Sequence, residues 1–155
     1  MYLPRWSNEI LDELRRTLLE KLGRSPEQVD HLLAELNRHF ADARVEGFET
    51  LVALMTNDQG DHVIAAAVKC GAEAIVTFNL RHFPDPALDT WIEAQHPDEF
   101  LVHLYHLNPD LMVNILHEQS AFIGRTLAQL LVVLKQGVPS FAQLISDSFG
   151  LKETE

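Results

Sequence analysis

Two polar side chains flank a short apolar segment in a way that could hold a metal ion. Asp61 opens the alanine-rich stretch "DHVIAAAVKC", and Asn79 directly follows the apolar run "AIVTF" at 74–78. Ligands of open α/β sheets bind at the carboxyl ends of the strands, so we expect both residues at one edge of a sheet. A carboxylate and an amide oxygen there suit a hard cation such as Mg²⁺ or Mn²⁺. The alternative is structural, because Asp is a common N-cap and Asn is common in turns.

Glu13 is a second candidate acid. It lies at the edge of the apolar stripe of a predicted helix, from where its carboxylate could lean into a cleft. The alternative is an ordinary solvated side chain. Its neighbour Asp12 points elsewhere, because adjacent residues on a helix do not share a face.

The histidines and the lone cysteine give weaker signals. His103 and His106 are three residues apart on a predicted helix and share a face, but no third ligand stands at a familiar zinc spacing. Cys70 lies among small residues at a helix end, where a packed thiol is expected rather than a nucleophile. The sequence contains neither a glycine-rich phosphate loop nor a "GxSxG" motif.

Two amphipathic helices are predicted in the first quarter of the chain. The stretch "WSNEILDELRRTLLEKLG" has an N-cap at Ser7 and a stop at Gly23. The stretch "SPEQVDHLLAELNRHF" begins with a capping box formed by Ser25 and Gln28. A short strand at 43–45 follows.

The centre of the chain predicts an α/β fold. Residues 61–70 form a helix, 74–78 form a strand that is apolar on both faces, and 91–95 form a weaker second strand. Apolarity on both faces is typical of a parallel sheet covered by helices, so we expect a small sheet of three or so strands. The remainder is helical. We therefore predict an α/β domain at 1–107 and an all-helical C-terminal extension at 108–155.

Composition limits the class of protein. The chain has 155 residues, of which 46% are hydrophobic, enough for one ordinary domain with a core. Its 12 Lys and Arg against 23 Asp and Glu give a net charge of −11, which argues against a broad basic surface for nucleic acid. An acidic site built around a metal stays compatible with that charge. The single cysteine fits the cytoplasm, and we expect no membrane segment.

Three stretches together resemble one known family. "DHVIAAAVKCGAEAIVTFNLRHFP" is similar to the second half of a PIN domain, the nuclease fold of VapC-type toxins. "RWSNEILDELRRTL" resembles the helix that carries an acidic residue of that family. "IEAQHPDEFLVHLYHLNPDLMVNILHEQ" resembles the helical C-terminal extension of one PIN subfamily in bacterial toxin–antitoxin pairs.

The resemblance implies a metal-dependent ribonuclease with an antitoxin protein as partner. By position, Glu13 matches the acidic residue of the helix and Asp61 the Asp that opens the alanine-rich helix. Asn79 falls where many members carry an Asp, and Ser7 matches a small polar residue near the site. Glu13 and Asp61 would hold Mg²⁺ or Mn²⁺, and the metal would activate a water for attack on RNA.

The chain also departs from the family pattern. Relatives have a strand and a helix before the position of "MYLPRWS", and that strand carries the first acidic residue, so Met1 could be a false start or a truncation. Asp58 competes with Asp61 for the same role, and Asn79 is neutral. We therefore expect cleavage to be weak or absent. The alternatives are a degenerate PIN protein that acts as a binding or regulatory module, and a helical interaction protein.

The helical tail predicts self-association. The segment "LAQLLVVL" at 127–134 is apolar nearly all round, and such a helix needs burial on more than one face. A sheet that lacks a central strand would also expose an apolar edge. We therefore expect a homodimer or larger, against the alternative of a compact monomer.

Overall fold

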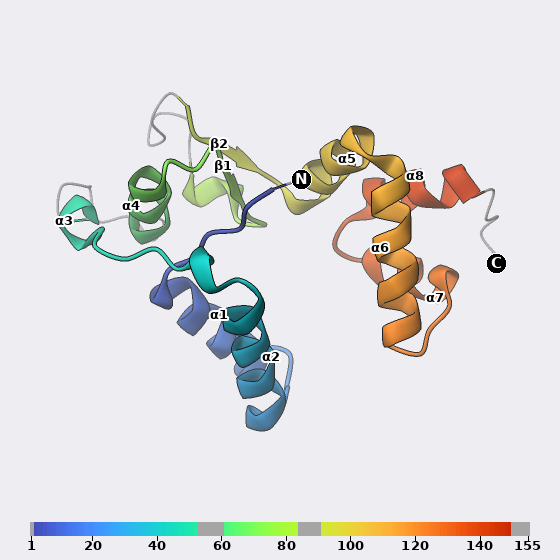
Figure 1. Cartoon of the computed structure of the whole chain (residues 1–155), viewed down its shortest axis with the longest axis horizontal. Coiled ribbons are helices and arrows are strands. Elements are labelled where there is room, and N and C mark those ends of the chain that lie inside the picture. Colours follow the sequence, from blue (N-terminus) through green and yellow to red (C-terminus); the bar gives the residue numbers. More distant parts are fainter. Residues whose placement is uncertain (1, 53–60, 84–90, 150–155) are drawn as a thin grey trace. The chain divides into compact units, whose positions relative to one another are not determined.

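A computed structural model describes residues 2–52, 61–83 and 91–149 (Figure 1). Its chain divides into two compact units. The α/β unit comprises Tyr2–Ile75 and Asn79–Ala94, and the helical unit comprises Val76–Phe78 and Gln95–Glu155. The division therefore passes through both strands of the small sheet.

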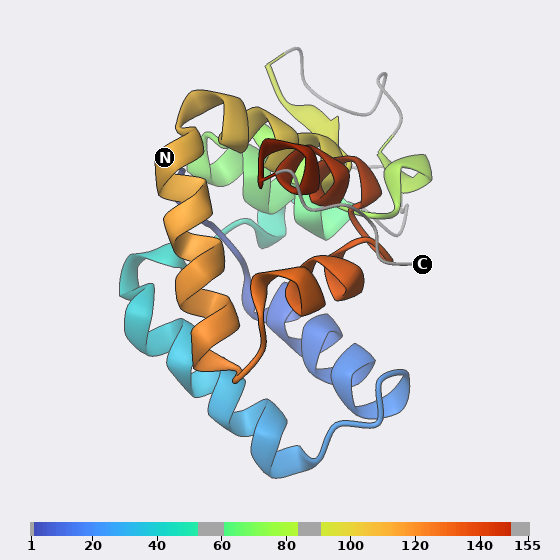
Figure 2. The same ribbon diagram turned by 90° about the vertical axis from the view of Figure 1, so that its right-hand side faces the viewer.

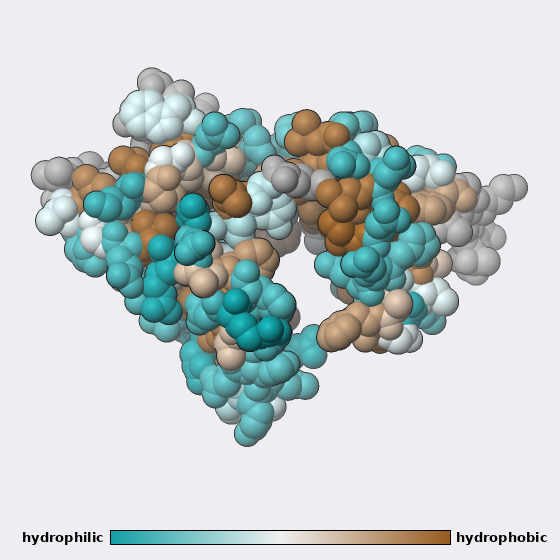
Figure 3. All heavy atoms as spheres, viewed as in Figure 1, coloured by the Kyte–Doolittle hydropathy of each residue, from teal (hydrophilic) through white to brown (hydrophobic). Residues whose placement is uncertain are grey.

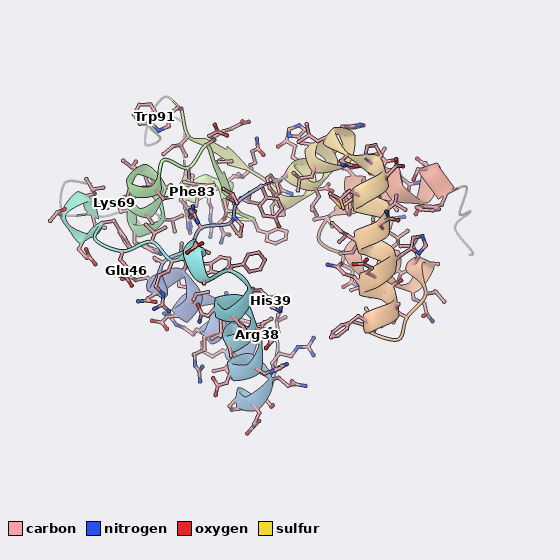
Figure 4. The ribbon with its side chains drawn as sticks, in the orientation of Figure 1. Arg38, His39, Glu46, Lys69, Phe83 and Trp91 are labelled. Carbon is pink, nitrogen blue, oxygen red and sulfur yellow. The ribbon has the colours of Figure 1, made fainter. Side chains whose placement is uncertain are left out.

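The two predicted N-terminal helices are confirmed, as are their caps. Helix α1 spans Asn8–Glu20, and the Ser7 hydroxyl accepts a hydrogen bond from the backbone amide of Ile10 at 3.3 Å. Helix α2 spans Pro26–His39 and begins with the predicted capping box. Helices α1 and α2 pack against each other, and the Arg15 side chain on α1 bonds to that of Asp30 on α2. At the end of α2, Arg38 and His39 both pair with Glu35 (Figure 4).

Short elements follow α2. They are the 3-10 helix η1 (Ala41–Ala43), helix α3 (Glu49–Val52), and the 3-10 helix η2 (Leu80–His82). The strand predicted at 43–45 is reduced to a single parallel bridge between Arg44 and Trp6. Two hydrogen bonds form that bridge, from Trp6 N–H to the Ala43 carbonyl and from Val45 N–H to the Trp6 carbonyl.

The predicted parallel sheet is present, but within the described residues it has two strands rather than the three or so expected. Strand β1 spans Ala74–Val76 and β2 spans Glu93–Gln95. Glu93 N–H donates to the Glu73 carbonyl and Thr77 N–H to the Gln95 carbonyl, which is a parallel register. The α/β fold and the second strand within 91–95 are thus confirmed.

The predicted burial of 74–78 on both faces is wrong. Only Ile75 is buried, whereas Val76 is 42% and Phe78 63% exposed. The physical reason is that helix α4 (Asp61–Cys70) supplies cover for the Ile75 side, where Ile64, Ala67, Phe83 and Ile92 complete an apolar cluster. Figure 4 shows Phe83 close to α4 and Trp91 away from it.

The described part of the helical unit contains four helices. They are α5 (Pro97–Leu107), α6 (Pro109–Phe122), α7 (Leu127–Leu134) and α8 (Pro139–Phe149), shown facing the viewer in Figure 2. Their shared core includes Leu104, Leu116, Leu131, Phe141 and Ile145.

Helix α5 packs against α8 and so belongs with the tail helices. The domain boundary at 107–108 stays a prediction. None of the helices that the structure describes has the length and apolar character needed to cross a membrane.

Candidate functional site

A contact between α1 and α4 brings two predicted site regions together. The Glu13 Oε1 atom on α1 lies 3.5 Å from the His62 Nε2 atom on α4. His62 directly follows Asp61, so the start of α4 lies close to the middle of α1. The Glu13 side chain is 54% exposed and that of His62 is 22% exposed, so solvent screens the pair and its own contribution to stability is small.

His62 is only partly satisfied in this arrangement. Its Nε2 atom is shielded from solvent and makes no hydrogen bond, although it lies within ion-pair distance of Glu13. The two observations agree, because 3.5 Å is long for an N–H···O hydrogen bond but still places the imidazole nitrogen next to the carboxylate.

The acid at the start of α4 is buried. Asp61 is 7% exposed and Ser7, at the start of α1, is 0% exposed. Helix starts offer free backbone amides and a positive field, which favour a carboxylate at such a position. Among the residues that the structure describes, Asp61 and Ser7 are the buried polar side chains of the α/β unit, and Ser120 is that of the helical unit.

Glu9 on α1 is a third carboxylate of this region, after Glu13 on the same helix and Asp61 on α4. A hydrogen bond from its own backbone amide lowers the pKa of the Glu9 carboxyl, and the Ser7 hydroxyl and nearby His62 lower it further, against a smaller opposing effect of burial. Glu9 and Glu13 are four residues apart and share one face of α1. Sequence reasoning did not single out Glu9 or His62. Glu9 lies one helical turn before Glu13, and His62 directly follows Asp61. These spacings could have indicated both residues from the sequence.

Asn79 lies at the end of the strand segment, as predicted. It precedes η2, and its carbonyl accepts a hydrogen bond from His82 N–H at 3.0 Å. A common cleft for Glu13, Asp61 and Asn79 stays a prediction. Asp58 lies outside the described residues.

The other candidates do not form a site. His103 and His106 are both exposed on α5. The Cys70 thiol is half-buried and donates to the Ala67 carbonyl at 3.5 Å, as expected of a packed thiol.

The donor set around α1 and α4 fits a metal ion only in part. Across residues 2–52, 61–83 and 91–149, no group of three His, Cys, Asp or Glu side chains is arranged to hold one. Hard cations take six or more oxygen ligands, several of them from the protein when binding is tight. Glu13 and Asp61 would supply two.

The described site region thus consists of a parallel pair of strands, an acid at the start of helix α4 and another acid on helix α1. Residues 97–147 match the family of the VapC50 C-terminal domain. The chain is also 45% identical over 101 residues to a protein of Mycobacterium tuberculosis (strain ATCC 25618 / H37Rv) named as a putative ribonuclease VapC50. Together these matches confirm the predicted resemblance to VapC-type PIN toxins over the matched residues.

The extent of the match is partial. The aligned region covers 62% of this chain and 60% of the relative. No solved structure matches the chain significantly.

Proposed function

We propose that the chain is a VapC-type toxin module whose chemistry is metal-dependent RNA cleavage in the cytoplasm, with an antitoxin protein as partner. One observation carries this proposal. At the 3.5 Å contact between Glu13 and His62, the start of α4, with its buried Asp61, lies beside the acidic face of α1. The printed name of the mycobacterial relative supports the same class of activity.

We further propose that the 155-residue chain cleaves RNA weakly. Glu13 and Asp61 are the two carboxylates that the resemblance assigns to the metal, and Asn79 brings no charge. Fewer carboxylates bind a hard cation less tightly. When bound, the ion would supply an activated water and stabilise charge on the phosphate. The role of the chain's own residues is to hold Asp61 in a buried position and Glu13 beside it.

A second candidate is a non-catalytic PIN protein that acts as a binding or regulatory module. The observation that favours it is the engagement of Glu13 by His62 within the chain itself. A carboxylate that already contacts an imidazole nitrogen of its own chain gains less from a metal ion, because the ion must displace that contact.

A Mn²⁺ titration combined with RNA cleavage separates the two candidates. The purified chain, Asp61→Asn and the matched control Asp110→Asn are compared by calorimetry with Mn²⁺ and by cleavage of a fluorescent single-stranded RNA. Asp110 suits the control because it is exposed and also lies in the first turn of a helix.

We expect weak Mn²⁺ binding that Asp61→Asn abolishes and Asp110→Asn preserves, with slow cleavage that follows binding. Robust cleavage lost in Asp61→Asn would contradict the weak-enzyme proposal while supporting the enzyme class. Absence of both Mn²⁺ binding and cleavage would favour the binding module.

A further inference from the structure

The contact between Glu13 and His62 has the spacing of two ligands of one metal ion. Zn²⁺ binds imidazole nitrogen and carboxylate oxygen at about 2.0–2.2 Å in a tetrahedral arrangement, which places two such donors about 3.3–3.5 Å apart. Octahedral Mg²⁺ binds its ligands at about 2.0–2.1 Å and so places neighbouring donors about 2.8–3.0 Å apart. Glu13 Oε1 and His62 Nε2 are separated by 3.5 Å, which suits the tetrahedral ion.

Neither atom is engaged in a hydrogen bond that an ion would have to break. His62 Nε2 is shielded from solvent and makes none. Glu13 forms no ion pair with a Lys or Arg among the residues that the structure describes. A shielded nitrogen without a partner is unfavourable until something binds it. The Glu13 side chain is 54% exposed, so its movement can admit an ion from solvent.

The surroundings of His62 are acidic. Glu9 lies one helical turn before Glu13 on the same face of α1, close enough to His62 for the two side chains to interact electrostatically. The buried Asp61 directly precedes His62 in the chain. Acidic side chains gathered in this way attract cations, so the region favours a divalent ion next to the imidazole.

We propose that His62 Nε2 is a ligand of the metal ion beside Glu13, and that this nitrogen shifts the preference of the site from Mg²⁺ toward a transition metal such as Zn²⁺. The inference rests on the metal-dependent function proposed above, for which the resemblance assigns carboxylates alone. Imidazole suits Zn²⁺, whereas oxygen ligands suit Mg²⁺ and Mn²⁺. The ion would lie beside both atoms rather than displace one of them.

Asp61 would complete the set of protein ligands. Three protein ligands and a water are typical of catalytic zinc sites. Among the described residues, Glu13 and His62 have ligand spacing, but no third acidic, His or Cys side chain is arranged with them to hold an ion. The Asp61 side chain would therefore turn toward the ion when the ion binds.

A second His–Glu pair provides a contrast. His39 Nε2 lies 3.4 Å from Glu35 Oε2 at the end of α2. The Arg38 guanidinium bonds both oxygens of Glu35, at 3.2 and 2.6 Å, and also lies 2.8 Å from His39 Nε2. Figure 3 shows a hydrophilic surface over α2, and Figure 4 shows Arg38 and His39 next to each other on this helix. Because a cation already occupies this carboxylate, we expect no metal ion there.

Calorimetry with Zn²⁺ and with Mg²⁺ on the whole chain tests the nitrogen ligand. His62→Gln should raise the Kd for Zn²⁺ about 30-fold, because loss of even an outer partner of a metal ligand costs about 10–100-fold in affinity. The Kd for Mg²⁺ should change less than about threefold, because Mg²⁺ takes oxygen ligands. His39→Gln is the matched control and should leave both constants unchanged.

Nitrogen NMR of the imidazole gives a readout that a merely structural role would not move. The Nε2 signal of His62, assigned through its bonds to the backbone, should shift when Zn²⁺ is added to the natural chain, and the Nε2 signal of His39 should not. This measurement needs no substitution. Circular dichroism and the retained affinity for Mg²⁺ check that His62→Gln folds.

Four outcomes would overturn the inference. They are unchanged Zn²⁺ affinity in His62→Gln, a His62 nitrogen signal that Zn²⁺ leaves in place, equal losses of Zn²⁺ and Mg²⁺ affinity, and the same loss in His39→Gln. If Asp61→Asn loses Mn²⁺ binding while His62→Gln keeps its Zn²⁺ affinity, the inference falls and the proposed function stands. If the natural chain binds no divalent ion, both fall.

Discussion

Asp98 joins the first and last helices of the helical unit. Its Oδ2 atom accepts a hydrogen bond from Ser140 N–H at 3.0 Å, and its Oδ1 atom accepts one from Phe141 N–H at 2.8 Å. These amides belong to the first turn of α8, where no intrahelical acceptor exists. Val138 precedes α8 and has no side-chain acceptor, so Asp98 on α5 acts as the cap from 42 residues away.

Replacement of Asp98 should weaken the unit measurably. Loss of a helix cap costs about 1 kcal/mol, and a hydrogen bond to a charged group contributes about 1.5–3 kcal/mol. Asp98 is half-buried, so we expect Asp98→Ala to lower the free energy of unfolding by about 2 kcal/mol. Asp98→Asn should lower it by about 1 kcal/mol, because an amide oxygen can replace only one of the two acceptors.

The stabilisation by Asp98 should depend on pH. Burial alone raises the pKa of the Asp98 carboxyl, but the bonds from Phe141 and Ser140, with some help from His96, outweigh it and lower that pKa. The unfolded chain has the ordinary Asp pKa, about 3.9. The contribution is therefore fully present above that value and is lost as the pH falls through the lower pKa of the folded state.

Hydrogen exchange by NMR measures this effect at the amides of Ser140 and Phe141. At neutral pH, Asp98→Ala should accelerate exchange there about 30-fold, which is the equivalent of about 2 kcal/mol. Glu99→Gln is the control, because Glu99 is an exposed acid in the same first turn and shares any general effect of charge at the helix start. Equal effects of the two substitutions, or a difference that persists unchanged at acid pH, would refute the capping role.

Two further changes test other contacts. Ser7→Ala removes the side-chain cap of α1 and should lower the free energy of unfolding, measured in urea, by about 1 kcal/mol. The same change should raise the pKa of the Glu9 carboxyl, because the hydrogen bond from the Ser7 hydroxyl is lost. An unchanged Glu9 pKa in an NMR titration would contradict this prediction. The rings of Phe78 and His96 lie edge to face, with their centroids 5.1 Å apart. A double-mutant cycle of Phe78→Ala with His96→Asn, which retains the cap of α5, should give a coupling energy of about 0.5–1.5 kcal/mol. A coupling energy near zero would contradict this contact.

The local parts of the fold were predictable because their signals are local. The caps at Ser7, Ser25 and Thr126 each lie within three residues of the amides they satisfy, so the sequence alone places the helix starts. Asp98 shows the opposite case. Its partners lie more than 40 residues away, and no local pattern marks a carboxylate on one helix as the cap of another.

The prediction that 74–78 is buried on both faces was wrong for a related reason. An apolar run indicates that a strand is available for burial, but which of its faces is covered depends on the elements that pack against it. Ile75 meets the α4 cluster, while Val76 and Phe78 group with the helical unit and remain largely exposed. An apolar run therefore does not by itself show that both faces of a strand are buried.

The boundary between the two units also passes between Phe78 and Asn79. Phe78 packs on His96 at the start of α5, and Asn79 is the next residue in the chain. A Cβ added at Gly137 would also meet the Phe78 ring, at 3.7 Å. Phe78 therefore packs within the helical unit, whereas Asn79, Glu13 and Asp61 all belong to the α/β unit.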